Sequence, residues 1–289
     1  FLLVGAGMHT TQTAGLALAA DLAPEAARPR VVALLYLMLL AGMIVSAIVF
    51  GALLGEFSQL RLIQVIQGGA IASLALNLVA LWKQEARSPQ RSAPARRADF
   101  AEAWRRFVGD GRATRFLVAV GLGTAAFSMQ DILLEPYGGE ILGLAVGQTT
   151  MLTAFLAAGA LAAFAVAARR LVRGSDPLRL AALGALVGVA AFSAVIFAAS
   201  LQSPLLFRVG TFLIGAGGGL FAVCMLTAAM GLDDGAGHGL ALGAWGAVQA
   251  TAAGAGIALG GALRDIVDGL AQSGALGSAL ALPTTGYAF

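Results

Sequence analysis

Long apolar runs separated by short polar connections make up most of this chain. The runs are about 20 residues long, the length at which an α-helix crosses a hydrocarbon core of ~30 Å. They predict an all-α membrane protein with eight spans and a weak or truncated ninth. The eight predicted spans are residues 1–20, 31–54, 62–82, 116–134, 146–168, 178–200, 205–230 and 240–263, and the ninth is 270–289.

A sequence echo relates the first span to the seventh. Residues 3–7 read Leu-Val-Gly-Ala-Gly, and residues 213–217 read Leu-Ile-Gly-Ala-Gly. Each copy opens an apolar run that ends at an aspartate, Asp21 or Asp233. Because the period is six spans, the echo indicates two similar six-helix halves, as in transporters built from internal repeats.

The longest polar stretch, residues 83–115, divides the chain. We predict that residues 1–82 end an N-terminal six-helix bundle (helices 4–6), and that residues 116–289 form the C-terminal bundle (helices 7–11 and part of 12). This is the two-bundle layout of the major facilitator superfamily. Because the chain starts at Phe1 inside an apolar run and stops at Phe289, we expect it to be an internal piece of a longer protein.

Composition agrees with a membrane location. The 289 residues are 59% hydrophobic and only 11% charged, with a mean hydropathy of +0.86, whereas a soluble domain needs more surface charge. The net charge of +3 and pI near 9.6 would suggest nucleic acid in a soluble protein. A lone cysteine, Cys224, permits neither a disulfide within the chain nor a cysteine metal site.

The basic residues assign the two sides of the membrane and account for the positive charge. All but three of the 18 Lys and Arg residues lie in alternate connections, and the other side holds Arg61, Arg208 and Arg264. Because cytoplasmic loops are enriched in Lys and Arg, we expect the basic connections to be cytoplasmic. They are residues 21–30, 83–115, 169–179 and 231–239.

A short amphipathic helix is predicted within the central linker, at residues 99–108. Helical spacing places Phe100, Trp104, Phe107 and Val108 on one face. Such a helix lies either at the membrane surface or packed under the bundle. The sequence favours neither position.

Polar residues interrupt the fourth span and are the first candidates for ligand binding. Gln130 and Asp131 lie deep in an apolar run, and Glu135 follows four residues later, before Pro136 and Tyr137. Carboxylates within a span are costly and face a cavity or a partner. In the alternative, the helix ends near Gln130 and these groups lie in water.

His9 and Gln12 share a face of the first span with Thr13 and are further ligand candidates. Histidine can ligate a metal in a macrocycle or relay protons. The alternative is a histidine that packs between helices and is hydrogen-bonded to a neighbour.

The loop after the first span resembles a cytoplasmic latch. Asp21 and Glu25 can pair with Arg28 and Arg30 and hold two helix ends together. The alternative is an ordinary charged loop, in which each exposed pair contributes less than about 1 kcal/mol.

Glycines four residues apart predict close packing of helices. These pairs are Gly51/Gly55, Gly215/Gly219, Gly239/Gly243 and Gly256/Gly260. The sequence contains no Ser-His-Asp set, no cysteine-rich metal site and no paired acidic motif for prenyl diphosphate. We therefore expect no enzyme and no metal centre.

Three segments resemble the bacteriochlorophyll delivery family, the PucC/LhaA-type proteins of phototrophic bacteria. They are residues 20–36, residues 130–139 (Gln-Asp-Ile-Leu-Leu-Glu-Pro-Tyr-Gly-Gly) and residues 143–154. The second string is the specific one, and the resemblance covers essentially the whole chain.

The resemblance implies a factor that assembles light-harvesting (LH1/LH2-type) complexes in the bacterial inner, photosynthetic membrane and handles bacteriochlorophyll, bound or in transit. Its partners would be antenna polypeptides, the reaction-centre core and chlorophyll synthesis enzymes, with membrane lipid and without nucleic acid. Two alternatives stay open. One is a major-facilitator secondary transporter of a small solute, and the other is an assembly chaperone without a ligand.

Overall fold

The computed structural model describes residues 28–82, 100–109, 111–231, 239–277 and 284–288, together with residues 3, 7, 10, 11, 15 and 18. Every regular element within these residues is a helix. The long helices are α2 (Arg28–Leu53), α3 (Gln59–Leu81), α5 (Gly111–Ser128), α7 (Val146–Val172), α8 (Pro177–Ser200), α9 (Pro204–Met230) and α10 (Gly239–Gln272). The short ones are α4 (Phe100–Gly109), the 3₁₀ turn η3 (Met129–Ile132), α6 (Leu134–Glu140) and α11 (Thr285–Ala288).

Seven helices within the described residues are long and apolar enough to cross a membrane, which confirms a multi-pass, all-helical protein. They correspond to the seven predicted spans from residue 31 onward. The first and ninth predicted spans, at the two ends of the chain, do not appear as described membrane-spanning helices. The first span, residues 1–20, lies outside the described residues except for six scattered helical positions, and α11 is the only described helix that begins after residue 270.

Polar caps followed by proline fix where two of the long helices begin. Asp176 Oδ1 accepts the backbone N–H of Leu178 at 2.8 Å, and Pro177 occupies the first turn of α8. Ser203 and Pro204 repeat this arrangement at the start of α9. A capping side chain satisfies a free N–H of the first turn, where proline loses no hydrogen bond.

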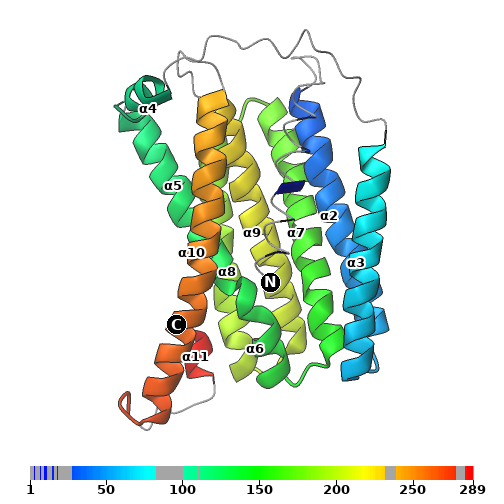
Figure 1. Cartoon of the computed structure of the whole chain (residues 1–289). Coiled ribbons are helices and arrows are strands. Elements are labelled where there is room, and N and C mark those ends of the chain that lie inside the picture. Colours follow the sequence, from blue (N-terminus) through cyan, green and yellow to red (C-terminus); the bar gives the residue numbers. More distant parts are fainter. Residues whose placement is uncertain are drawn as a thin grey trace.

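The helices pack around α9, as Figure 1 shows. Helices α7 and α8 both lie against α9, α2 packs on α7, and α5 pairs with α10. Helix α3 lies at the edge, next to α2, and none of its residues is buried. Helix α4 lies at one end of the bundle, and α6 and α11 lie at the other.

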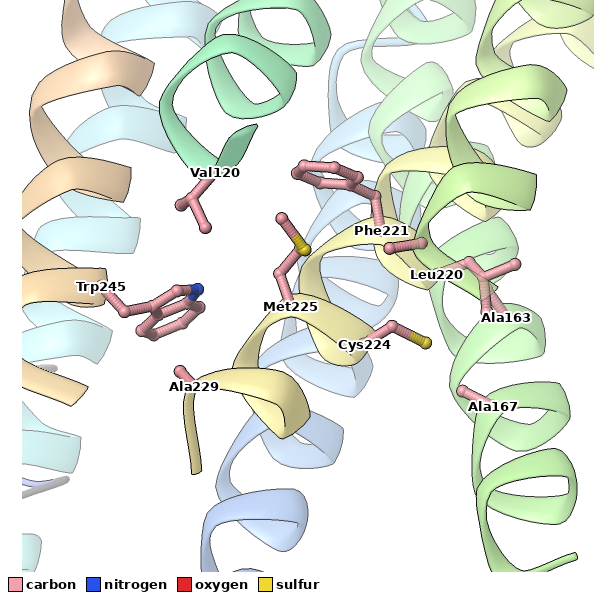
Figure 2. Close-up of a cluster of buried hydrophobic side chains, with 10 residues drawn as sticks. Val120, Ala163, Ala167, Leu220, Phe221, Cys224, Met225, Ala229 and Trp245 are labelled. Carbon is pink, nitrogen blue, oxygen red and sulfur yellow. The ribbon is translucent and has the colours of Figure 1, made fainter. Parts of the chain in front are cut away.

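A cluster of buried side chains joins these helices (Figure 2). On α9, Met225 points toward Val120 of α5 and Trp245 of α10, whereas Cys224 points to the side of α7 that carries Ala167. Helix α9 therefore holds the α5–α10 pair and α7 in one core.

Glycine allows the closest helix contacts, as the four-residue spacing predicted. A Cβ on Gly147 of α7 would lie 2.6 Å from Gly51 O and 3.2 Å from the Cα of Gly55. Gly51 of α2 and Gly55 just beyond its end therefore both lie against α7. Backbones can approach this closely only where a side chain is absent.

The other glycine pairs give a mixed result. A Cβ on Gly219 would lie 2.7 Å from the Cα of Ala160, and one on Gly256 would lie 2.6 Å from Ala125 O. Their partners Gly215 and Gly260 also lie against backbone atoms. The prediction for Gly239/Gly243 is wrong at Gly243 within the described part of the chain, where a Cβ would meet no atom within 4 Å.

The predicted amphipathic helix in the linker is confirmed as α4, but its apolar face is divided. Phe107 is 5% exposed and packs with Leu117 of α5 and Ala244 of α10. Trp104 and Val108 remain 36% and 37% exposed. Helix α4 is thus fastened to the bundle and also presents apolar side chains outward.

Candidate functional site

The site lies where the fourth predicted span departs from α-helix. Helix α5 ends at Ser128, η3 follows, and α6 begins at Leu134. Pro136 has no N–H to donate to the carbonyl of Ile132, which prevents a continuous α-helical ladder through this stretch. Asp131 therefore lies in η3 and Glu135 in α6, so the two carboxylates do not share one face of a single α-helix, as their four-residue spacing would predict.

Gln130 of η3 is buried, with 9% of its surface exposed. Its Nε2 donates a hydrogen bond to Asp131 Oδ1. Its Oε1 has no hydrogen-bond partner in the described part of the chain. A buried acceptor without a donor lowers the stability of the fold by about 1–3 kcal/mol, so Gln130 destabilises the protein unless another group binds to its Oε1.

An apolar cavity of about 310 Å³ adjoins Gln130. It lies between η3, α6, α8, α10 and α11, and most of its lining is hydrophobic. The lining residues are Ala126, Met129, Gln130, Leu133, Leu134, Tyr137, Phe192, Val195, Ile196, Gly260 and Tyr287. Such a volume lies near the lower limit of ~300–1,000 Å³ for small-molecule sites.

Both tyrosines of the cavity use their hydroxyls within the protein. Tyr137 is buried, and its OH donates to the carbonyl of Val195 at 3.0 Å. Its ring contacts Phe207 and Tyr287, each with 5.4 Å between ring centroids. The rings therefore form an aromatic wall, and Gln130 Oε1 is left as the unpaired buried acceptor of the lining.

A cluster of polar side chains closes the cavity at the α11 end. The OH of Tyr287 donates to Glu140 Oε2 at 2.6 Å, and Arg264 Nη2 donates to that OH at 3.0 Å and lies 3.3 Å from Glu140. Arg264 also pairs with Asp265 at 3.0 Å. These bonds connect α6, α10 and α11.

No local sequence pattern predicts this cluster, because Glu140 and Tyr287 are 147 positions apart. A glycine also contributes. A Cβ on Gly286 would lie 2.9 Å from Asp268 Cβ and 3.0 Å from Arg264 O, so α11 lies directly on α10.

The cluster perturbs Tyr287. Burial, together with the hydrogen bond to Glu140, raises the pKa of its hydroxyl to about 12, although the Arg264 charge acts in the opposite direction. The Tyr287 hydroxyl is therefore neutral at any physiological pH and remains a donor to Glu140.

Comparison with known protein families shows that residues 1–288 match the family described as PUCC protein. The chain belongs to the PucC family. "Protein PucC" of Rhodovulum sulfidophilum is 54% identical over 92% of this chain. The "Uncharacterized protein in puhA-bchM intergenic region" of Rhodobacter capsulatus is 53% identical over 99% of it.

A more distant relative is the "Bacteriochlorophyll synthase 44.5 kDa chain" of Rhodobacter capsulatus, 28% identical over 92% of this chain and 63% of its own length. The chain spans about 60% of the length of the relatives from Rhodovulum sulfidophilum and from the puhA-bchM intergenic region. No solved structure matches it significantly.

The structure brings together some of the predicted site residues of this PucC-family chain. Gln130 and Tyr137 line the cavity, and Asp131 holds the Gln130 amide. Asp131 and Glu135 are themselves exposed. Within the described residues no group of three His, Cys, Asp or Glu side chains could hold a metal ion.

Other predicted site residues cannot be placed. His9, Gln12, Asp21 and Glu25 lie outside the described residues. Arg28 and Arg30 of the predicted latch belong to the first turn of α2, and their side chains are not described. Phe100, from the predicted membrane-surface helix, is the first residue of α4, and its side chain is not described either. The pigment-ligand and latch hypotheses for these residues stay predictions.

Proposed function

We propose that this PucC-family chain belongs to an assembly factor for bacterial light-harvesting complexes of the LH1/LH2 type. The factor binds bacteriochlorophyll or delivers it to antenna polypeptides in the photosynthetic inner membrane. The observation that carries the proposal is the PUCC match over residues 1–288. The relative named "Bacteriochlorophyll synthase 44.5 kDa chain" adds a connection to the pigment.

The cavity beside Gln130 suits part of such a pigment. Its apolar lining and aromatic wall fit a hydrocarbon tail or a ring edge, and Gln130 Oε1 offers one acceptor for a hydrogen bond. A macrocycle with a long tail is much larger than about 310 Å³, since even drug-sized ligands fill ~300–1,000 Å³. The pigment would therefore enter only in part and leave the rest in lipid.

The chain's own residues supply binding rather than catalysis in this proposal. Gln130 orients a polar group, Tyr137 and Tyr287 form the wall, and the Glu140–Arg264 pair holds α11 across one end of the cavity. His9 and Gln12 remain candidate ligands. The partners we propose are antenna polypeptides, the reaction-centre core and chlorophyll synthesis enzymes, with lipid and without nucleic acid.

For the architecture we propose the two six-helix bundles of the major facilitator superfamily. Residues 1–82 would contribute to the first bundle and residues 116–289 to the second, joined by the cytoplasmic linker 83–115. Helix α2 packs closely on α7 across the linker, so these two helices would form part of the contact between the bundles.

The test is deletion of the gene in its phototrophic host, followed by complementation. We expect membranes of the deletion strain to lose most of their near-infrared antenna absorption and antenna polypeptides. The wild-type gene should restore both, and Gln130→Leu should restore them only weakly. The matched control is Gln64→Leu, which removes an exposed amide of α3 outside the cavity.

The outcomes of deletion, complementation and purification test different parts of the proposal. Antenna levels unchanged by deletion would overturn the assembly role. Full restoration by Gln130→Leu would leave the assembly role intact and remove the cavity from it. Purified protein with copurifying bacteriochlorophyll would support pigment handling rather than a ligand-free chaperone.

A second candidate is a major-facilitator secondary transporter of a small solute. The volume of about 310 Å³ favours it, because a small solute would fit the cavity whole. Lost uptake of a solute with unchanged antenna complexes, in the same deletion strain, would select this function.

A further inference from the structure

The corner between α4 and α5 has a geometry that the proposed function does not use. Thr114 Oγ1 of α5 donates to the carbonyl of Val108 in α4 at 3.0 Å. Phe107 is buried against α5 and α10. These contacts fix the direction of α4 relative to a membrane-spanning helix.

Two arginines of this corner have unoccupied guanidinium nitrogens. Arg105 Nε donates to the carbonyl of Ala101 at 3.2 Å, and Arg115 Nε donates to the carbonyl of Gly111 at 3.0 Å. Both side chains are exposed, and neither makes an ion pair within the described residues. Each arginine is thus held by its own helix, with both Nη groups available to an anion.

Exposed apolar side chains continue from this corner along α5. Trp104 and Val108 of α4 are partly exposed, and Val118 and Leu122 of α5 are 55% and 70% exposed. Helix α5 begins a candidate span, Gly111–Glu140, so these α5 side chains face the hydrocarbon of a bilayer. Positive charge therefore lies at the end of a lipid-facing apolar surface.

We propose that the α4–α5 corner binds an anionic phospholipid through its headgroup phosphate. Arg105 and Arg115 pair with phosphate oxygens, for which the guanidinium fork is well suited. Trp104 lies at the level of the headgroups, and an acyl chain runs along Val118 and Leu122. A soluble polyanion would match the arginines but would leave the apolar surface of α5 without a partner.

Native mass spectrometry of the purified full chain tests the proposal. The chain is released from nanodiscs of phosphatidylglycerol and phosphatidylcholine, and the lipids retained on it are compared. We expect wild type to retain phosphatidylglycerol preferentially. In Arg105→Gln/Arg115→Gln, the preference for phosphatidylglycerol should fall about thirtyfold, because each arginine near the membrane surface contributes ~1 kcal/mol to binding an anionic lipid.

The matched control is Arg169→Gln/Arg173→Gln, which removes the same charge from the α7–α8 connection at the same end of the molecule. It should keep the wild-type preference. An equal loss in the control would replace a local site by a diffuse basic surface and overturn the proposal. Displacement by inorganic phosphate or glycerol phosphate as readily as by lipid would show that the apolar surface takes no part, and would also overturn it.

A second measurement tests the proposal even if the arginine variants do not fold. In a Trp82→Phe background, Trp104 is the exposed tryptophan, because Trp245 is buried. Phosphatidylglycerol with brominated chains should quench its fluorescence more than brominated phosphatidylcholine does. Equal quenching by the two lipids would contradict the site even if the arginine variants cannot be purified.

Discussion

Polar residues beside the cavity differ in whether their side-chain oxygen has a hydrogen-bond partner. Tyr137 and Tyr287 have their hydroxyls fully used, by Val195 and by Glu140. Gln130 keeps one buried oxygen without a partner. Because an unpaired buried acceptor costs stability, Gln130 is the residue of the cavity on which the binding proposal depends most.

Tyr287 should titrate unusually late. With a pKa of about 12 instead of 10.0, its phenolate should form roughly two pH units above an ordinary tyrosine. The stabilising contribution of the neutral hydroxyl is complete below pH 10 and is lost as the pH rises toward 12. Phenolate absorbance of wild type minus that of Tyr287→Phe measures this midpoint, and a midpoint near pH 10 would contradict the described contacts.

Pairs of helices are held together at positions without side chains. Gly147 of α7 lies against Gly51 of α2 and Gly55 just after it, and α9 is packed through glycine in the same way. Lipid is as apolar as the helix surfaces, so these close van der Waals contacts supply much of the attraction. The pairing of α2 with α7 therefore depends on individual glycines.

Substitution of Gly147 by alanine should separate α2 from α7. The new Cβ would lie 2.6 Å from Gly51 O, and such overpacking costs about 1–3 kcal/mol. The control is Gly243→Ala, where a Cβ meets nothing within 4 Å and a helix-favouring residue should be harmless. Thermal unfolding in mild detergent compares the two, and equal melting temperatures would disprove the close contact.

On the scale of the whole molecule, the described arginines of the α4–α5 corner and of the α7–α8 connection lie at one end, and the cavity lies at the other end, beside α6 and α11 (Figure 1). If the basic end is cytoplasmic, the cavity is near the outer surface of the membrane. A ligand would then reach it from the outer leaflet or from the external side.

Cysteine labelling of intact cells tests this orientation. In a Cys224→Ala background, Leu201→Cys in the α8–α9 connection should react with a membrane-impermeant maleimide several-fold faster than Val172→Cys at the end of α7. Both positions are exposed, and Leu201 is the less exposed of the two, at 66% against 89%, so faster labelling of Leu201→Cys would not arise from greater accessibility in the fold. Opened cells should label both equally, whereas faster labelling of Val172→Cys in intact cells would reverse the orientation.

Much of the fold could be predicted from the sequence because lipid imposes a simple length rule on apolar helices. The seven described spans and the close contacts of Gly51 and Gly215 follow from local patterns. Gln130 also stood out, as an amide within an apolar run. The pairing of Glu140 with Arg264 and Tyr287 could not be predicted, since it depends on how distant helix ends meet.

Helix α3 has no buried residue, although it is 23 residues long and lies beside α2. Among the described residues, α3 receives little packing support from its neighbours. Its backbone hydrogen bonds persist because hydrocarbon offers no competing partner, so the bilayer acts as the solvent that keeps it folded. Among the described helices, α3 is consequently the one whose order depends most on the lipid, and the one that should respond first to a change of membrane thickness.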